Sequence, residues 1–210
     1  MKISYLLIII TTAATSCTQK SETFVEKENN TKQIIAYDGD LQNRNNGKFY
    51  LKGTTNLFTG IEILHYADGT IKQQLPLTNG VAQGTRMRWH SNGVMESIGS
   101  YSNAMRTGYW RTWNSDGSKN KEGTFVKGKP EGEQIFWHTN GLKSVVWNFS
   151  SGHPNGLMRS FYDNGRKKQE GVYTNNLKHG KWKNWNKSGQ LNKIAEFQMG
   201  KLIKEEEYQN

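Results

Sequence analysis

The sequence predicts an all-β protein, an elongated and open antiparallel sheet that grows like a solenoid from tandem 24-residue β-hairpins. Two glycine columns with a spacing of 24 residues run through six repeats without an insertion. The second glycine follows Asp, Asn or Ser each time, and two columns of mostly aromatic residues keep the same spacing. The glycine columns are Gly60, Gly84, Gly108, Gly132, Gly156 and Gly180, and then Gly69, Gly93, Gly117, Gly141, Gly165 and Gly189.

Composition agrees with many short strands rather than with an ordinary globule. Only 34% of residues are hydrophobic and the mean hydropathy is −0.82, yet the chain holds 7 Trp, 9 Tyr and 8 Phe. This is too polar for a large packed core and too aromatic for a disordered chain. The formal charge of +10 favours an acidic or anionic partner over a basic one, although surface charge that only maintains solubility is an equally simple reading.

The first residues are typical of an export signal. Residues 1–16 combine Lys2 with a short apolar run, too short to span a bilayer, and are expected to be a signal peptide. Ala14-Thr15-Ser16-Cys17 resembles a bacterial lipobox, so Cys17 is the expected lipidation site; a plain signal peptide with an incidental cysteine is the alternative. Cys17 is the single cysteine, which excludes an intramolecular disulfide.

These features predict the location of the protein and the layout of its N-terminal part. It is expected to be exported and anchored to a membrane by lipid, in the outer membrane of a Gram-negative bacterium. Residues 17–33 form the lipidated cysteine and a polar, disordered tether. Residues 34–59 form a degenerate opening unit, in which Asn46-Gly47 and Gly53 echo the repeat without its spacing.

Six hairpin repeats occupy residues 60–203. Each is expected to hold a strand of about six residues, a turn, and a strand of about eight, giving about 12 to 14 strands in all. The Asp-Gly and Asn-Gly pairs predict two-residue type I′ turns. Such a turn at Asp116-Gly117 pairs Trp110 with Gly123, as if a ring covered a glycine of its partner strand; a three-residue loop with a bulge would shift this register by one.

The same turn gives one pair for each of the other repeats. These pairs are Glu62 with Leu75, Arg86 with Gly99, Gln134 with Trp147, Met158 with Gly171, and Trp182 with Ala195.

Links between hairpins carry their own turn signals, such as Asn79-Gly80 and Asn175-Asn176. One aromatic column holds Trp89, Trp113, Trp137, Phe161 and Trp185, with His65 in the first repeat. The other holds Tyr101, Phe125, Phe149, Tyr173 and Phe197, with Leu77 in the first repeat. Equivalent positions in successive hairpins lie about 9–10 Å apart, and intervening side chains can bridge that gap into a ladder. Residues 204–210 are expected to form a polar C-terminal cap.

This pattern of Gly, aromatic, Asx-Gly, aromatic and Gly resembles the bacterial MORN-repeat variants, often grouped as YwqK-type antitoxins. The resemblance covers roughly residues 36–203. It implies an elongated, twisted antiparallel sheet that gains one hairpin per repeat. For function it implies a scaffold that binds proteins or membranes. An antitoxin that neutralises a cytoplasmic toxin would have no use for a signal peptide, which counts against transferring the antitoxin role whole.

No constellation typical of an enzyme occurs in the sequence, and the protein is expected to be non-catalytic, with no cofactor and no metal site. His90 and His138 hold one repeat position two hairpins apart, about 19 Å from each other, too far to share a metal ion. Tyr66 and Tyr162 hold the same position, so a ring-sized structural residue is the better interpretation. The glycines recur at turns and do not form a phosphate-binding loop.

A binding face is the best functional candidate. Lys119, Lys143 and Lys167 hold one repeat position in three consecutive hairpins, with Lys121 close by in sequence. We expect this row, or the tryptophans Trp89, Trp113, Trp137 and Trp185, to bind a partner, which is an acidic protein or, for the lysine row, envelope phosphates, but no nucleic acid. Alternatively the lysines only keep an open sheet soluble and discourage edge pairing.

Two further functions are consistent with this face. The protein could be an immunity protein that meets a toxin in the cell envelope. It could also be a glycan-binding or glycan-processing envelope protein that stacks sugars on tryptophan.

Overall fold

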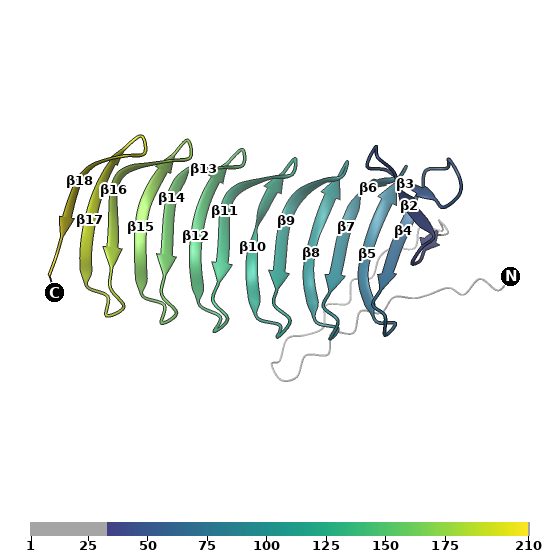
Figure 1. Ribbon diagram of the computed structural model, residues 1–210, viewed down its shortest axis with the longest axis horizontal. Helices are drawn as coiled ribbons and strands as arrows, with labels where there is room; N and C mark the ends of the chain where they lie inside the picture. The colour runs from purple at the N-terminus through teal and green to yellow at the C-terminus, as the bar shows by residue number, and fades with distance from the viewer. Residues whose placement is uncertain (1–32, 210) are drawn as a thin grey trace. The chain divides into compact units, whose positions relative to one another are not determined.

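The computed structural model describes residues 33–209, which form one continuous sheet of 16 strands and a separate two-stranded sheet (Figure 1). The long sheet is open, with β1 at one end and β18 at the other, so the predicted all-β, open repeat architecture is confirmed. The strands are β1 (Ile35–Ala36), β2 (Leu41–Asn43), β3 (Phe49–Leu51), β4 (Gly60–His65), β5 (Ile71–Thr78), β6 (Val81–Ala82), β7 (Gly84–Trp89), β8 (Met95–Ser102), β9 (Met105–Trp113), β10 (Lys119–Val126), β11 (Lys129–Trp137), β12 (Lys143–Ser150), β13 (His153–Pro154), β14 (Gly156–Phe161), β15 (Lys167–Thr174), β16 (Leu177–Trp185), β17 (Leu191–Gln198) and β18 (Lys201–Glu207).

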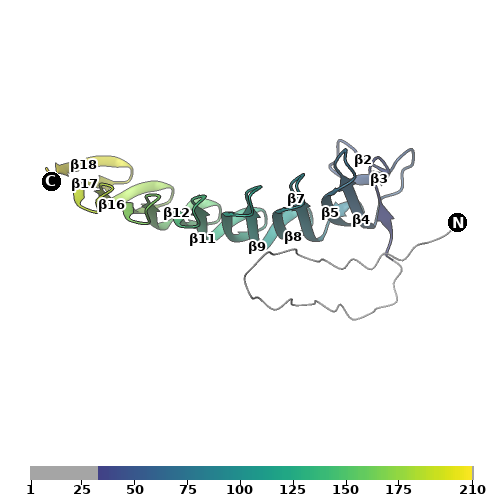
Figure 2. The same ribbon diagram turned by 90° about the horizontal axis from the view of Figure 1, so that it is seen from below.

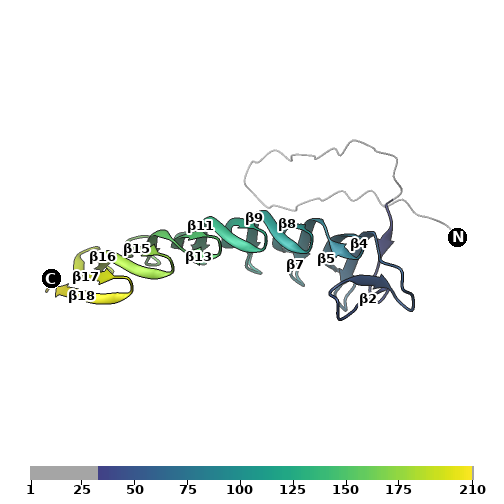
Figure 3. The same cartoon turned by 90° about the horizontal axis from the view of Figure 1, so that it is seen from above.

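Each 24-residue repeat supplies one hairpin, and successive hairpins pair in sequence order. Hairpins one to six are β4–β5, β7–β8, β9–β10, β11–β12, β14–β15 and β16–β17. Seen along the strands in Figures 2 and 3, the sheet is a single layer of curved hairpins. The strand number exceeds the predicted 12 to 14 because β6 and β13 are two-residue strands that lie in the links between hairpins.

The first end of the sheet departs from the antiparallel pattern. β1 pairs in parallel with β4, with Ile35 opposite Ile61. β2 and β3 pair only with each other. Ala36, Phe58, Leu75 and Leu77 form a buried cluster here, each at most 7% exposed. Residues 34–59 therefore form a cap that covers the apolar first hairpin.

The Asx-Gly turns differ from the prediction. In hairpin two, the N–H of Gly93 donates to the carbonyl of His90, and the N–H of His90 to the carbonyl of Val94. This is a three-residue loop in which only Gly93 has a positive φ, the pattern of a type I turn closed by a G1 bulge. The Asn92 side chain favours it, because its Oδ1 accepts from the N–H of Val94 two residues on. The type I′ prediction for these turns is wrong.

Type I′ turns occur instead at the links. Each link is a two-residue loop with both residues at positive φ, such as Asn79 (48°) and Gly80 (71°). The sheet thus has two distinct borders, which we call the turn edge (the Asx-Gly loops, at the bottom of Figure 1) and the link edge (at the top).

The predicted strand register is nevertheless correct. Trp110 lies opposite Gly123, and the equivalent residues pair as expected in all six hairpins. The three-residue loop shifts the register by one, and a bulge in the next residues shifts it back, as between Lys119 and Lys121. Two irregularities cancel, which is why the simpler turn gave the right pairs.

Large side chains cover glycines of the neighbouring hairpin, not of their own partner strand. A Cβ on Gly99 would lie 2.1 Å from Trp110, and one on Gly171 would lie 2.2 Å from Trp182. Rings then contact one another along this face: Tyr173 lies 5.0 Å from Trp182. We call this side of the sheet the core face, because it holds Trp110 and Trp182, which are 6% and 1% exposed.

The last strand closes the repeat series differently. β18 is exposed along its whole length, and Lys204 stands where the preceding repeats have a glycine at positive φ. Its register with β17 shifts by a single residue, between Glu196 and Phe197. The charged side chains of β18 make it a poor template for further strand pairing.

Candidate docking face

The lysine row and the tryptophan column lie on the same face of the sheet. Lys119 is directly opposite Trp113, and Lys143 is directly opposite Trp137. Directly opposite residues of an antiparallel pair project to the same side. Trp113 is three residues after Trp110 in β9, so this side is the one opposite the core face. We call the surface formed by Lys119, Lys143, Lys167, Trp89, Trp113, Trp137 and Trp185 the Lys–Trp face.

Lysine ammonium groups contact the indole rings of this face. The Nζ of Lys119 lies 4.7 Å from the ring centroid of Trp137, and the Nζ of Lys143 lies 5.9 Å from the same ring. Lys167 reaches Trp185 of the next hairpin at 5.4 Å. These distances are within the range of cation–π attraction. The lysines are exposed and the tryptophans half-buried, so the charge lies outermost.

Carboxylates neutralise part of the lysine row. Lys119 pairs with Glu122 at 3.5 Å, and Lys167 with Glu170 at 3.1 Å. Partial burial acts to raise the pKa of Glu170, but hydrogen bonds from Lys167 and Arg159 outweigh it and the pKa lies below its usual value. Within residues 33–209 no carboxylate pairs with Lys143. The centre of the row therefore carries an uncompensated cation.

The second aromatic column and Lys121, which the sequence could not assign to a side of the sheet, do not belong to the Lys–Trp face. The second aromatic column lies on the core face, where Phe125 contacts Trp110 at 6.3 Å. Lys121 also lies there, over Phe125 and Phe136. Burial, and next the nearby charge of Arg106, lowers the pKa of Lys121. Lys121 does not extend the predicted lysine row.

The histidines have a structural use along the turn edge. The Nε2 of His90 lies 3.0 Å from the carbonyl oxygen of Trp113, 23 residues later, in the next hairpin. The hydroxyl of Tyr162 donates to the carbonyl of Trp185 across the same distance in sequence, at 2.8 Å. Histidine and tyrosine are thus equivalent at this repeat position, as predicted. In the described part of the chain, no group of three or more His, Cys, Asp or Glu side chains could hold a metal ion.

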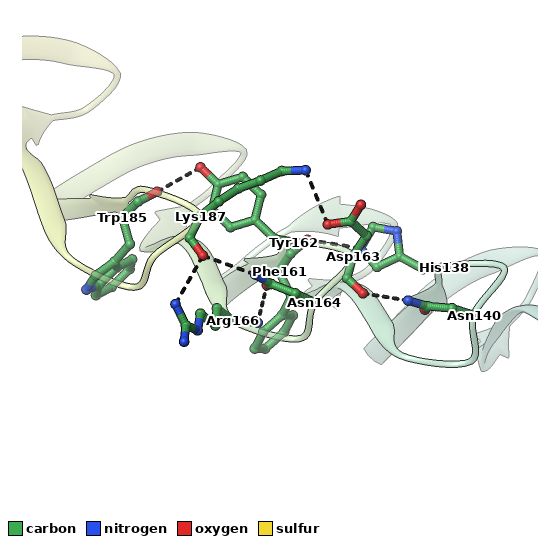
Figure 4. Close-up of polar contacts among 9 residues, drawn as sticks. All are labelled: His138, Asn140, Phe161, Tyr162, Asp163, Asn164, Arg166, Trp185 and Lys187. Carbon is green, nitrogen blue, oxygen red and sulfur yellow. Dashed lines mark hydrogen bonds and ion pairs between the residues drawn. The ribbon is translucent and has the colours of Figure 1, made fainter.

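Asparagines of the Asx-Gly turns make a second contact of this kind, which the sequence interpretation missed. The Nδ2 of Asn164 donates to the carbonyl of Lys187 at 3.0 Å, again 23 residues later. Figure 4 shows these contacts for hairpins four, five and six, together with the Asp163–Lys187 ion pair at 3.4 Å. We call such a side-chain hydrogen bond from one turn to the next a latch. A signal was present in the residue before the second glycine, which is Asn in hairpins two, four and five but Asp in hairpins one and three, because only the Asn side chain has a donor.

Cys17, the expected signal peptide and most of the expected tether lie outside the described residues. Between residues 33 and 209 there is no helix that is long and apolar enough to cross a membrane.

Comparison with known families supports the repeat assignment. Residues 82–103, 154–175 and 178–199 each match the family described as MORN repeat variant. The three segments lie in hairpins two, five and six and start at the same repeat position. No curated protein matches the chain. The fold is accordingly a β-hairpin repeat scaffold that resembles MORN repeats over these segments.

Proposed function

We propose that the protein is a non-catalytic scaffold of the cell envelope that docks an acidic protein surface on its Lys–Trp face. The observation that supports this is the shared face: three lysines in register lie opposite half-buried aromatic rings, which are Trp113, Trp137 and Phe161. Lys143 has no carboxylate partner within residues 33–209. Tryptophan supplies large contact area at low entropic cost, and the lysine row selects for negative charge. A repeat sheet presents such groups in a rigid line.

The test uses a poly-glutamate peptide as the acidic probe and the tryptophan fluorescence of the protein as the signal. Replacing Lys119, Lys143 and Lys167 by Gln should weaken binding at least about tenfold, because it removes three cations that attract the acidic peptide. A tenfold change corresponds to roughly 1.4 kcal/mol of binding free energy. Wild-type affinity should also fall as salt rises above physiological strength, where the Debye length is already about 8 Å.

The matched control replaces three exposed lysines outside this face by Gln, namely Lys48 and Lys52 of the cap and Lys127 of a link. It removes the same charge and should leave the affinity nearly unchanged. Equal loss in both triple variants would contradict a specific face. Binding of anionic phosphatidylglycerol vesicles with no binding of the peptide would indicate a membrane surface as the partner instead.

We also propose that Cys17 is lipidated and anchors the exported protein in the outer membrane. Its position in a lipobox-like sequence after an apolar run supports this. Metabolic labelling of intact cells with an alkyne fatty acid should label the wild type and not Cys17→Ser, and the variant should appear in the soluble fraction. An unlabelled wild type would refute the anchor.

A further inference from the structure

The latches along the turn edge are unequal from one hairpin to the next. Hairpins two and four each use a histidine and an asparagine, through His90, Asn92, His138 and Asn140. Hairpin five uses Tyr162 and Asn164, with additional contacts from Arg166 to the next turn. Hairpin one has a single latch, from Tyr66 to Trp89.

Hairpin three has no latch to hairpin four. Asn114 stands at the position of the ring and is too short to reach the next turn; its Nδ2 donates to Ser118 Oγ inside its own loop, at 2.9 Å. Asp116 stands at the position of the asparagine, and its carboxylate accepts from Ser118 but has no hydrogen to donate. Within residues 33–209, no side-chain hydrogen bond joins these two turns.

The core face also differs at this junction, where a glutamine stands in place of a tryptophan and its Nε2 donates to the carbonyl of Thr124. Trp110 covers Gly99 between hairpins two and three, and Trp182 covers Gly171 between hairpins five and six, whereas here Gln134 covers Gly123. Gln134 is fully buried, and its Oε1 has no hydrogen-bond partner. An amide in place of an indole buries less apolar surface, and the unpaired oxygen adds a desolvation cost.

Hairpin three resembles the final hairpin in sequence. Trp110, Trp113, Asn114 and Phe125 recur three repeats later as Trp182, Trp185, Asn186 and Phe197. Asn186 likewise bonds within its own loop, to Gln190 at 3.0 Å, and no Asx-Gly turn follows it in the described residues. Hairpin three is thus built like the end of a three-hairpin unit, although hairpin four follows it.

We propose that the sheet consists of two three-hairpin units, residues 60–131 and 132–203. The two units open from each other at the turn edge between β10 and β11. The strand ladder from Lys121–Phe136 to Val126–Lys129 remains, as do the contacts of Lys119 with Trp137 and Lys121 with Phe136. The link edge is continuous past this point, since Gly152 donates to the carbonyl of Pro130. Opening therefore starts at the turns and is hinged at the links. In a nearest-neighbour repeat array, the weakest interface sets the boundary between cooperative units.

Hydrogen exchange of the full chain, followed by mass spectrometry, tests the proposal. In the wild type, amides at the turn ends of β10 and β11 should exchange faster than their equivalents in β15 and β16. Installing the missing latches with Asn114→His and Asp116→Asn should slow those β10 and β11 amides about tenfold or more, since two hydrogen bonds are added.

Two controls identify the cause. Asn186→His with Ser188→Asn makes the same kind of change on hairpin six, which no Asx-Gly turn follows within the described residues, and should slow no amide. His138→Asn with Asn140→Asp removes the latches between hairpins four and five, and should create a second fast-exchanging junction at β12 and β14. Equal exchange rates in the wild type at the β10–β11 and β15–β16 junctions would overturn the proposal. So would unchanged exchange of the β10 and β11 amides after the latches are installed.

Discussion

The residues of the link edge must adopt a positive φ, and they differ in how easily they do so. Both residues of each type I′ loop have positive φ, a region that glycine and asparagine tolerate and most other residues avoid. Asn79-Gly80 and Asn175-Asn176 meet this demand. Ala104 does not, since it has a φ of 60° with neither a glycine backbone nor a side chain that could bond locally.

Replacing Ala104 by Gly should therefore stabilise the protein. The expected gain is roughly 0.5–1 kcal/mol, which is the relief of left-handed strain less the greater flexibility of glycine in the unfolded chain. Urea titration measures it as a higher midpoint at unchanged slope. Ala82→Gly is the control with the opposite expected sign. Ala82 lies in strand β6 against the core cluster, so its replacement by Gly should lower the stability of the protein by a similar amount. A lower urea midpoint for Ala104→Gly than for the wild type would contradict the claim that Ala104 is strained.

At the scale of the hairpin, the period alone predicts the strands and their pairing. Trp110 pairs with Gly123 because side chains alternate with a period of two and the repeat leaves no spare residue. The turn type could not be predicted, because Asn-Gly suits a type I′ loop and a G1 bulge equally and the bulge after the turn hides the difference. The choice depends on an Asx side chain that bonds the backbone two residues on, and also on the next turn 23 residues away.

The candidate site was predictable in its members but not in its arrangement. Lys119, Lys143 and Lys167 share a repeat position, so any regular sheet aligns them. That Trp137 lies beneath Lys119 and Lys143 follows from the three-residue loop, which places Lys119 opposite Trp113 rather than one residue away. The sequence therefore offered lysines and tryptophans as alternatives, and the fold combines them in one surface.

At the scale of the whole sheet, the unlatched junction coincides with the middle of the Lys–Trp face. Lys119 belongs to hairpin three, and Trp137 and Lys143 belong to hairpin four. An acidic partner that contacts both lysines would bridge the junction and favour its closed form by mass action. The proposed binding and the proposed opening are coupled in this way, although each is tested separately.

Removing hairpin three tests whether the junction, rather than length, divides the sheet. Deleting residues 108–131 joins Thr107 to Gly132, in place of the native bond between Glu131 and Gly132. Hairpin two then precedes hairpin four, and His90 and Asn92 face turn carbonyls 23 positions on, as they do now. We expect a soluble β protein that is smaller and less stable overall, yet unfolds in urea as a single unit, with circular dichroism and tryptophan fluorescence giving coincident transitions.

Deleting residues 84–107 is the matched control for this change. It also removes 24 residues in register but leaves Asn114 and Asp116 facing hairpin four. The opening between β10 and β11 should persist there. The circular dichroism and fluorescence transitions should therefore not coincide, and we expect the same of the full chain. Complete unfolding of both deletions would contradict a nearest-neighbour array, and non-coincident transitions after removal of 108–131 would show that the boundary does not depend on the missing latches.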